Sequence, residues 1–133
     1  MLDEILLRTK EKVEFVDITS KLQNLIKKHQ INNGQLQIHI PHTTAAVTIN
    51  ENADPSVKKD IIKEINKIIP FNDNYSHMEG NSAAHIKSSL FGVDQLLIIK
   101  NGKLDLGTWQ SVYFCEFDGP RSRKVKLQII QAD

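Results

Sequence analysis

The sequence predicts an α+β fold, with a mainly antiparallel, β-sandwich-like sheet, two main helices and one short helix. Three observations lead to this class. Strand-like segments follow one another as hairpins, helical segments are inserted between them, and 133 residues make up about one domain. No repeat, low-complexity tract or flexible linker interrupts the chain. We therefore predict a single domain over residues 1–133.

The first 40 residues contain three predicted strands and one predicted helix. Residues 2–9 and 13–16 are strand-like and flank a charged turn. From Asp17 onwards the apolar residues have the spacing of a helix that buries one face, at Ile18, Leu22, Leu25 and Ile26. Residues 35–40 then alternate polar and apolar side chains, as a half-buried strand does.

The alternation changes register next to Pro41. Apolar residues occupy even positions up to Ile40 and odd positions from Ala45 onwards. A strand with a two-residue period cannot change faces without an extra residue or a bend. We therefore predict a bulge or turn at Pro41–Thr43, a feature that often lies beside functional sites. Two strands joined by a tight loop are the alternative. In either case, the face opposite the core is predicted to hold His42, Thr44, Ala46, Thr48 and Asn50.

The rest of the chain predicts two more helices and a run of strands. Asp54 and Pro55 suit the N-cap and first position of a helix that ends at Pro70. A polar loop leads to a short helix over about residues 82–90, which Asn81 begins and Gly92 ends. The remaining segments predict strands joined by an Asn101-Gly102 hairpin turn and an Asp118-Gly119-Pro120 turn. These strands span residues 93–100, 103–106, 109–117 and 123–131.

Composition excludes several classes of protein. The chain carries 17 Lys and Arg residues against 16 Asp and Glu residues, so its net charge is +1. Nucleic-acid binding by bulk electrostatics needs a strong basic excess, so we expect no nucleic-acid partner. No apolar stretch approaches the roughly 18 residues of a membrane span, and the N-terminus does not have the pattern of a signal peptide. Cys115 is the single cysteine, which suits a reducing compartment. We expect a cytoplasmic protein with no membrane partner.

Three of the five histidines lie in places that suit a ligand. His42 stands at the predicted register break, and His77 lies in the polar loop. On the short helix, His85 points away from the predicted core face and lies beside small polar residues. Neutral imidazoles can bind zinc or a similar ion with an open position for water, although the spacing matches no compact metal motif. The alternative is that each is a surface or capping histidine.

Two carboxylates are further candidates. Glu51 follows a predicted strand and has no local structural duty, so it is the better acid–base or metal candidate. Its neighbour Asp54 already serves as an N-cap. Glu116 lies in an almost wholly apolar strand, where a carboxylate must be paired, exposed on one face or shifted in its pKa. A structural role for Glu116 would pair it with an arginine of the neighbouring strand.

Arg121 and Arg123 are the only arginines besides Arg8. They are two residues apart, so on a strand they share one face. The planar guanidinium group suits carboxylate or phosphate in a way that lysine does not. The two arginines either form ion pairs with Glu116 or Asp118, or bind an oxyanion together.

Three segments carry a resemblance to a known family: HTTAAVTINENADPSVKKDI, AHIKSSLFG and LGTWQSVYFCEFDGPRSRKV. They resemble the YjbQ family, whose members are described as secondary thiamine-phosphate synthases, and the resemblance runs through nearly the whole chain. It implies a compact, sandwich-like α+β domain that assembles as a homotrimer. It also implies a polar site with histidines and, in several members, a bound divalent metal.

Together, the residues and the resemblance give each candidate a role. The predicted metal ligands are His42, His77 and His85. Imidazoles favour a zinc-like ion, and the nearby carboxylates also permit magnesium or calcium. The predicted catalytic residues are Glu51, His85, Thr43 and Thr44. The residues predicted to bind the phosphorylated substrate are Arg121, Arg123, Lys87, Asn50, Asn81, Trp109 and Gln110.

The activity implied by the resemblance joins a thiazole phosphate to a pyrimidine pyrophosphate and expels pyrophosphate. The dedicated synthase is a (β/α)₈ barrel, a fold that typically needs about 250 residues, so this chain is too short to form it. The sequence also lacks a glycine-rich phosphate loop and a carboxylate-rich magnesium site. Two hypotheses follow. One is a metal-associated enzyme acting on a small phosphorylated metabolite, with thiamine-phosphate synthesis as a main or secondary activity. The alternative is a trimeric protein that binds a small ligand or metal and has only incidental catalytic activity.

Overall fold

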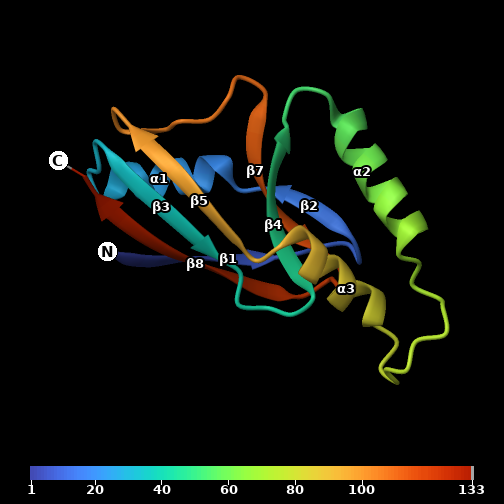
Figure 1. The fold of residues 1–133 in the computed structure, drawn as a ribbon. Coiled ribbons are helices and arrows are strands. Elements are labelled where there is room, and N and C mark those ends of the chain that lie inside the picture. Colours follow the sequence, from blue (N-terminus) through green and yellow to red (C-terminus); the bar gives the residue numbers. More distant parts are fainter. Residues whose placement is uncertain (133) are drawn as a thin grey trace.

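The computed structural model describes residues 1–132. Its strands form two sheets, one in the order β1-β8-β3-β5-β6 and one in the order β2-β7-β4. Every neighbouring pair of strands is antiparallel. In Figure 1 the three-stranded sheet lies between the five-stranded sheet and helices α2 and α3. The fold is therefore α+β, as the sequence predicts.

The elements follow the predicted order closely. The strands are β1 (Leu2–Arg8), β2 (Glu14–Asp17), β3 (Gly34–His39), β4 (Ala45–Glu51), β5 (Asp94–Lys100), β6 (Lys103–Leu104), β7 (Gln110–Glu116) and β8 (Ser122–Gln131). The helices are α1 (Thr19–Lys28), α2 (Pro55–Ile68) and α3 (Ser82–Phe91). The predicted strand over residues 103–106 is shorter than expected, because only its first two residues pair with β5.

The main core fills the space between the two sheets. Helix α1 contributes Leu22 and Ile26, which are completely buried. Burial of apolar surface is the main favourable term in folding, and the inward positions of the long strands supply most of it here. They are Ile5, Leu7, Leu36, Ile38, Ala45, Val47, Leu97, Ile99, Val112, Phe114, Val125, Leu127 and Ile129.

A second core covers the other face of the three-stranded sheet. Phe15, Ala46 and Phe117 pack there against Ala84 and Phe91 of α3. The rings of Phe91 and Phe117 meet edge to face, with their centroids 5.2 Å apart. The prediction that Ala46 lies opposite the core is therefore wrong, because this sheet is buried on both faces.

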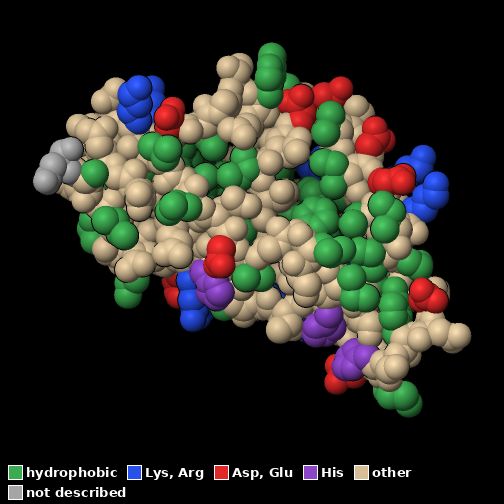
Figure 2. Space-filling view, in the orientation of Figure 1, with side chains coloured by type: hydrophobic (Ala, Val, Ile, Leu, Met, Phe, Trp, Pro, Cys, Tyr) green, Lys and Arg blue, Asp and Glu red, His purple; other side chains and the backbone are tan. Residues whose placement is uncertain are grey.

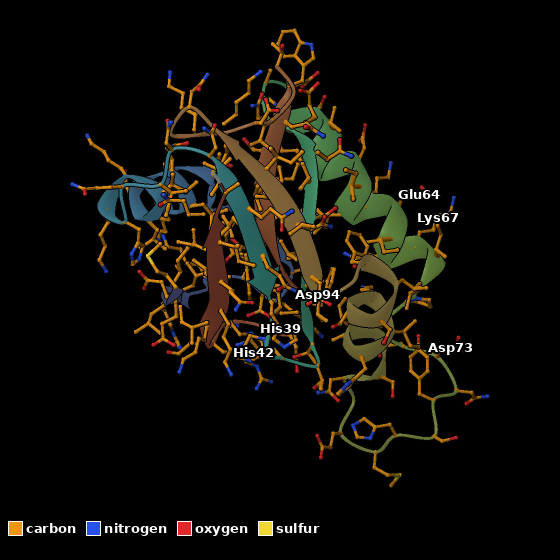
Figure 3. All side chains as sticks on the ribbon, turned by 60° about the vertical axis from the view of Figure 1, so that its left-hand side comes forward. His39, His42, Glu64, Lys67, Asp73 and Asp94 are labelled. Atoms are coloured by element: carbon orange, nitrogen blue, oxygen red, sulfur yellow. The ribbon has the colours of Figure 1, made fainter. Side chains whose placement is uncertain are left out.

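The register break coincides with the passage from one sheet to the other. β3 ends at His39 in the five-stranded sheet, and β4 begins at Ala45 in the three-stranded sheet. The connection is thus a tight loop between two strands, the second of the two predicted alternatives, and not a bulge within one strand. Figure 3 shows that this loop brings His42 to the same end of the sheets as His39.

Local signals in the sequence place several turns and caps correctly. The Asp54 side chain accepts a hydrogen bond from the Ser56 amide at 2.9 Å, which caps α2 as predicted. Asn101 and Gly102 both have positive φ angles, 53° and 77°, as a type I′ hairpin turn requires. Among residues 1–132, no helix is long and apolar enough to cross a membrane.

Candidate functional site

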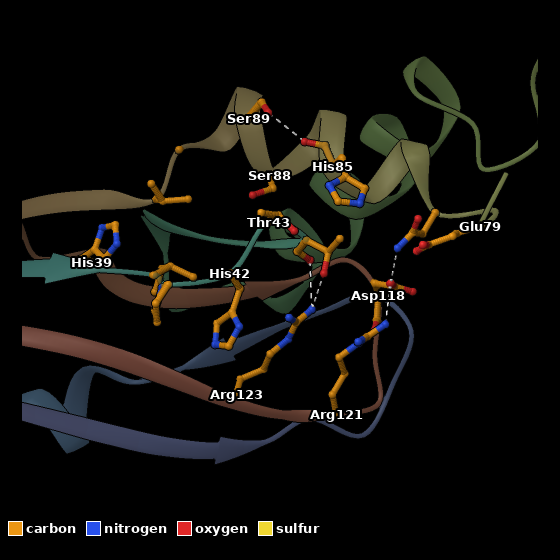
Figure 4. Close-up of a pocket in the computed structure, with 16 residues that line it drawn as sticks. His39, His42, Thr43, Glu79, His85, Ser88, Ser89, Asp118, Arg121 and Arg123 are labelled. Atoms are coloured by element: carbon orange, nitrogen blue, oxygen red, sulfur yellow. Dashed lines mark hydrogen bonds and ion pairs between the residues drawn. The ribbon is translucent and has the colours of Figure 1, made fainter. Parts of the chain in front are cut away.

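A polar cavity of about 930 Å³ opens where the 40–44 connection, α3 and the β7–β8 turn meet. Figure 2 shows histidine side chains along the lower edge of the molecule, on the side where α3 and this connection lie. Figure 4 shows the side chains of the cavity wall converging from these three segments. The polar residues that line it are His39, His42, Thr43, Thr44, Glu79, Asn81, His85, Ser88, Ser89, Asp118, Arg121 and Arg123.

A buried ion pair joins Arg123, which lines the cavity, to Glu116. Glu116 is 0 % exposed, and Arg123 is 6 % exposed. Arg123 Nε donates to Glu116 Oε1 at 2.9 Å, and Thr9 Oγ1 donates to the same oxygen at 2.7 Å. Burial acts to raise the pKa of Glu116, but the hydrogen bonds from Arg123 and Thr9 outweigh it and hold the pKa below its ordinary value. Glu116 is thus paired with an arginine of the neighbouring segment, which the sequence offers as the structural role.

The pairing uses only part of the Arg123 guanidinium group. Its Nη2 donates to Glu116 Oε2. The same Nη2 also donates to Thr44 Oγ1 at 2.8 Å. Its Nη1 makes no hydrogen bond to any residue of the described chain. Because Arg123 lines the cavity, a fixed cationic donor remains available to a ligand there. Structural pairing and oxyanion binding, the two alternatives for Arg123, are therefore compatible.

Arg121 lies at the rim of the cavity and is held by Asp118. Its Nε donates to the Asp118 carbonyl oxygen at 2.6 Å, and its Nη2 donates to Asp118 Oδ2 at 2.8 Å. Asn81 Nδ2 donates to the same carboxylate oxygen at 3.0 Å. The side chain of Arg121 is about half exposed, 51 %, so its remaining donors face solvent. The two arginines thus present positive charge to one cavity from different depths.

His42 is fixed by the backbone of β8. Its Nε2 accepts a hydrogen bond from the Lys124 amide at 3.0 Å. Burial lowers the pKa of His42, and the positive charge of Arg123 lowers it further. Both effects favour the neutral imidazole. Figure 4 shows His42 beside Arg123 in the cavity wall.

His85 lies in the cavity wall formed by α3, and the ring of His77 lies against it. Their rings meet edge to face with centroids 5.6 Å apart. His85 lines the main cavity, whereas His77 lines a smaller neighbouring cavity of about 380 Å³ that shares His85 with it. His77 Nε2 is 3.7 Å from Glu79 Oε2. The ring nitrogens of His85 form no hydrogen bond within residues 1–132, so they are available to a ligand.

The three predicted metal ligands do not form one metal centre in this arrangement. His42 and His77 line different cavities, and the accepting nitrogen of His42 is already engaged. Residues 1–132 contain no cluster of three or more histidine, cysteine or acidic side chains placed to hold a metal ion. The predicted set of His42, His77 and His85 therefore does not fit the metal that the resemblance implies.

Four predicted site residues lie at the far end of the three-stranded sheet. β4 and β7 pair antiparallel, with Ala45 opposite Glu116 and Glu51 opposite Gln110. Six residue steps along a strand span roughly 20 Å. The cavity lies at the Glu116 end, so the structure does not bring the far group to it. That group consists of Glu51, Asn50, Trp109 and Gln110.

Lys87 also points away from the cavity. It is 0 % exposed, its Nζ donates to Asn66 Oδ1 of α2, and it lies over the Phe71 ring, 3.8 Å from the centroid. Burial lowers the pKa of Lys87 to about 8, and the charge of Lys12 adds to this effect. Lys87 joins α3 to α2 and is not placed to bind phosphate.

The sequence prediction misses several polar residues at the site, and Thr9 and His39 are two of them. Thr9 comes from the end of β1 and has no signal in the local sequence, because only the β1–β8 pairing brings it to Glu116. His39 is not among the three histidines that the sequence singles out, but it lines the cavity and its Nδ1 is 2.8 Å from Asp94 Oδ1. Its place at the end of a strand, just before the register break, is the sequence signal that points to it.

The fold and the site define a small α+β domain with an open cavity whose arginines and neutral imidazole suit an anionic ligand. The chain belongs to the YjbQ family, because the family model described as "UPF0047 protein YjbQ-like" matches residues 3–132.

Relatives from distant organisms are similar over their whole length. The chain is 52 % identical to UPF0047 protein MJ1081 of Methanocaldococcus jannaschii, with 98 % of this chain and 94 % of the relative aligned. It is 46 % identical to UPF0047 protein YugU of Bacillus subtilis, covering 98 % of this chain and 99 % of YugU. A crystal structure of a YjbQ/UPF0047 protein from Clostridium acetobutylicum superposes with a TM-score of 0.94 at 50 % identity, over 96 % of this chain and 99 % of that one. The predicted family and fold class are thereby confirmed.

Proposed function

We propose that this protein is an enzyme that acts on a small phosphorylated metabolite bound in the polar cavity. The reaction implied by the resemblance is thiamine-phosphate synthesis, as a main or secondary activity. The observation that carries the proposal is the position of Arg123, which lines the cavity. Glu116 and Thr44 fix its Nε and Nη2, and its Nη1 makes no hydrogen bond within residues 1–132. A donor held in this way needs no reorganisation when it meets an anion.

The arginines suit a reaction in which pyrophosphate leaves. Negative charge grows on the leaving group as its bond breaks, and preorganised cationic donors stabilise that charge most effectively. Arg123 offers such a donor from a buried position, and Arg121 offers a second charge from the rim. Guanidinium groups also match the geometry of phosphate oxygens.

His85 is the candidate for proton transfer. Its ring nitrogens are not engaged by other residues of the described chain, and imidazole can accept or donate a proton near neutral pH. Thr43 is exposed at the cavity and offers a hydroxyl group to orient the substrate. The divalent metal that the resemblance implies takes no part in these steps, because the predicted histidine set does not fit it.

A matched pair of variants separates this proposal from the alternative of a trimeric binding protein with incidental activity. His85→Ala is expected to lower turnover about 100-fold, measured as pyrophosphate released from the pyrimidine pyrophosphate in the presence of the thiazole phosphate. Lys67→Ala, on the outer side of α2 (Figure 3), is the control and should keep full turnover. Unchanged turnover in folded His85→Ala would contradict the catalytic assignment and favour the binding protein.

We also propose that the protein assembles as a homotrimer. The outer face of the five-stranded sheet is not covered by any helix of the described chain, and it carries apolar side chains that are at least half exposed. They are Leu2, Leu6, Leu96, Ile98 and Ile130. Gln35, Gln37 and Gln128 lie between them in the strand register. The same face also carries charged side chains, among them Glu4 and Lys126, which face each other in the β1–β8 register. Exposed apolar patches bordered by polar and charged side chains are typical of subunit contacts.

A further inference from the structure

The hydrogen bond between His42 and β8 has a consequence for the chemistry of the cavity. The last residue pair between β3 and β8 is His39 with Lys126. Lys124 lies two residues before Lys126 in β8, and its amide faces the edge of β8 beyond the end of β3. His42 Nε2 accepts the hydrogen bond from this amide at 3.0 Å. The imidazole thus occupies the place of the missing strand.

This hydrogen bond determines the tautomer of His42. An amide N–H can only donate, so Nε2 must carry a lone pair and no proton. In a neutral imidazole the proton then resides on Nδ1. Nδ1 makes no hydrogen bond within residues 1–132, and His42 lines the main cavity. The ring therefore offers a neutral N–H donor to a ligand there.

We infer that His42 is a hydrogen-bond donor to an oxyanion and not a metal ligand. This inference rests on the proposed function, because it names the ligand chemistry of the same cavity. Metal coordination needs a free lone pair on nitrogen. His42 has one lone pair, which the Lys124 amide occupies, and the nearby charges of Arg123 and Arg121 repel a cation.

The same arrangement is favourable for a phosphoryl group. Arg123 Nη1 supplies a charged donor to the cavity, and His42 Nδ1–H supplies a neutral donor beside it (Figure 4). A neutral donor adds a directed hydrogen bond to the anion. Hydrogen bonds to charged groups are stronger than those between neutral groups. The predicted ligand class is therefore a phosphate monoester or diphosphate.

The tautomer can be measured in the unaltered protein. Nitrogen-15 NMR of protein labelled in its histidines distinguishes a protonated ring nitrogen from one with a lone pair, and the His42→Ala spectrum assigns the His42 signals. Near neutral pH we expect the Nδ1–H tautomer. An Nε2–H tautomer or a doubly protonated ring would overturn the inference, whatever the enzyme does.

Two variants then test the donor with inorganic phosphate as the probe. The Asn side chain places its amide nitrogen near the position of Nδ1, whereas the Gln side chain reaches the position of Nε2 and can still accept from Lys124. In calorimetric titrations, His42→Gln is expected to weaken phosphate binding about tenfold. His42→Asn is expected to lose less phosphate affinity than His42→Gln, because its amide nitrogen can replace the Nδ1–H donor. Equal affinity in His42→Gln and the unaltered protein would overturn the donor role.

The outcomes for this inference and for the proposed function are distinguishable. If Arg121→Ala weakens phosphate binding and His42→Gln does not, the cavity binds anions and only the role of His42 is wrong. If the unaltered protein binds no phosphate, both are wrong. Metal analysis of the purified protein provides a third check, since His42→Ala is expected to leave the metal content unchanged. A lower metal content in folded His42→Ala would contradict the inference.

Discussion

Arg123 is the residue in which the structural role of the buried ion pair and the proposed binding of an anion meet. Removing one member of a buried ion pair leaves the other charge without compensation. Glu116 therefore stabilises the fold and also fixes the guanidinium group that faces the cavity. The sequence shows Glu116 to be unusual, because a carboxylate in an apolar strand needs a partner. It does not show which arginine pairs with it, since that depends on the register between segments.

The first prediction concerns this pair. Glu116→Gln is expected to lower the free energy of unfolding by about 3 kcal/mol, measured by urea denaturation near neutral pH. The amide keeps the size of the side chain but cannot compensate the buried guanidinium charge. Arg8→Ala, an exposed arginine outside the cavity, is the control and should change stability little. A Glu116→Gln protein as stable as the unaltered one would contradict the assigned role.

The same pair predicts a pH dependence. The pKa of Glu116 in the folded protein lies below its ordinary value, so the ionised form is favoured in the fold. The resulting stabilisation is fully present above the pKa of a glutamate in the unfolded chain. It is lost as the pH falls through the lower pKa of the folded state. Urea denaturation at decreasing pH should therefore show a loss of stability in the unaltered protein that Glu116→Gln lacks. The same dependence of stability on acid pH in both proteins would contradict this role of Glu116.

At the scale of elements, local signals and long-range pairing differ in how well the sequence predicts them. The Asp54 cap and the Asn101-Gly102 turn depend on a few neighbouring residues, so residue types suffice to place them. The register break also shows in the alternation of side chains. That the chain changes sheets there is not visible, because it depends on which strands pair.

The same limit explains which of the predicted site residues the structure brings together. His42, His85 and the two arginines reach the cavity from three segments, and their residue types pointed to a ligand. Glu51 lies only seven residues after Thr44 in the sequence, but the extended strand between them carries it roughly 20 Å away. Sequence proximity alone therefore does not show which end of a strand faces a site.

Lys87 gives a prediction for the helical layer. Its pKa is lowered from 10.5 to about 8, so the fold disfavours the charged form. Between these two pH values the unfolded chain binds more protons than the folded one, and the free energy of unfolding should rise with pH. Lys87→Met has no titrating group there and should lack this rise. Urea denaturation at several pH values from 8 to 10.5 measures it, and equal slopes for the two proteins would contradict the account.

At the scale of the whole molecule, the balanced net charge conceals an uneven distribution. The cavity gathers both of the arginines near the β7–β8 turn together with His42 and His85. The outer face of the five-stranded sheet instead carries exposed apolar side chains, with glutamine and charged side chains among them. The two surfaces differ in chemistry, which suits a small ligand on one and a second copy of the chain on the other.

The assembly can be measured directly. Light scattering is expected to give three times the chain mass of 15.1 kDa. Ile98→Lys, which places a charge on the exposed apolar face, should shift the mass towards that of one chain. Lys100→Ala, an exposed residue at the end of the same strand, is the matched control. A mass near 15.1 kDa for the unaltered protein would contradict the trimer.

We propose that the phosphoryl group of the substrate binds in the cavity beside Arg123. A crystal structure of the protein with inorganic phosphate tests it most directly. We expect a phosphate ion within hydrogen-bonding distance of Arg123 Nη1 and His42 Nδ1. Phosphate bound at another place, or an empty cavity at saturating phosphate, would contradict it.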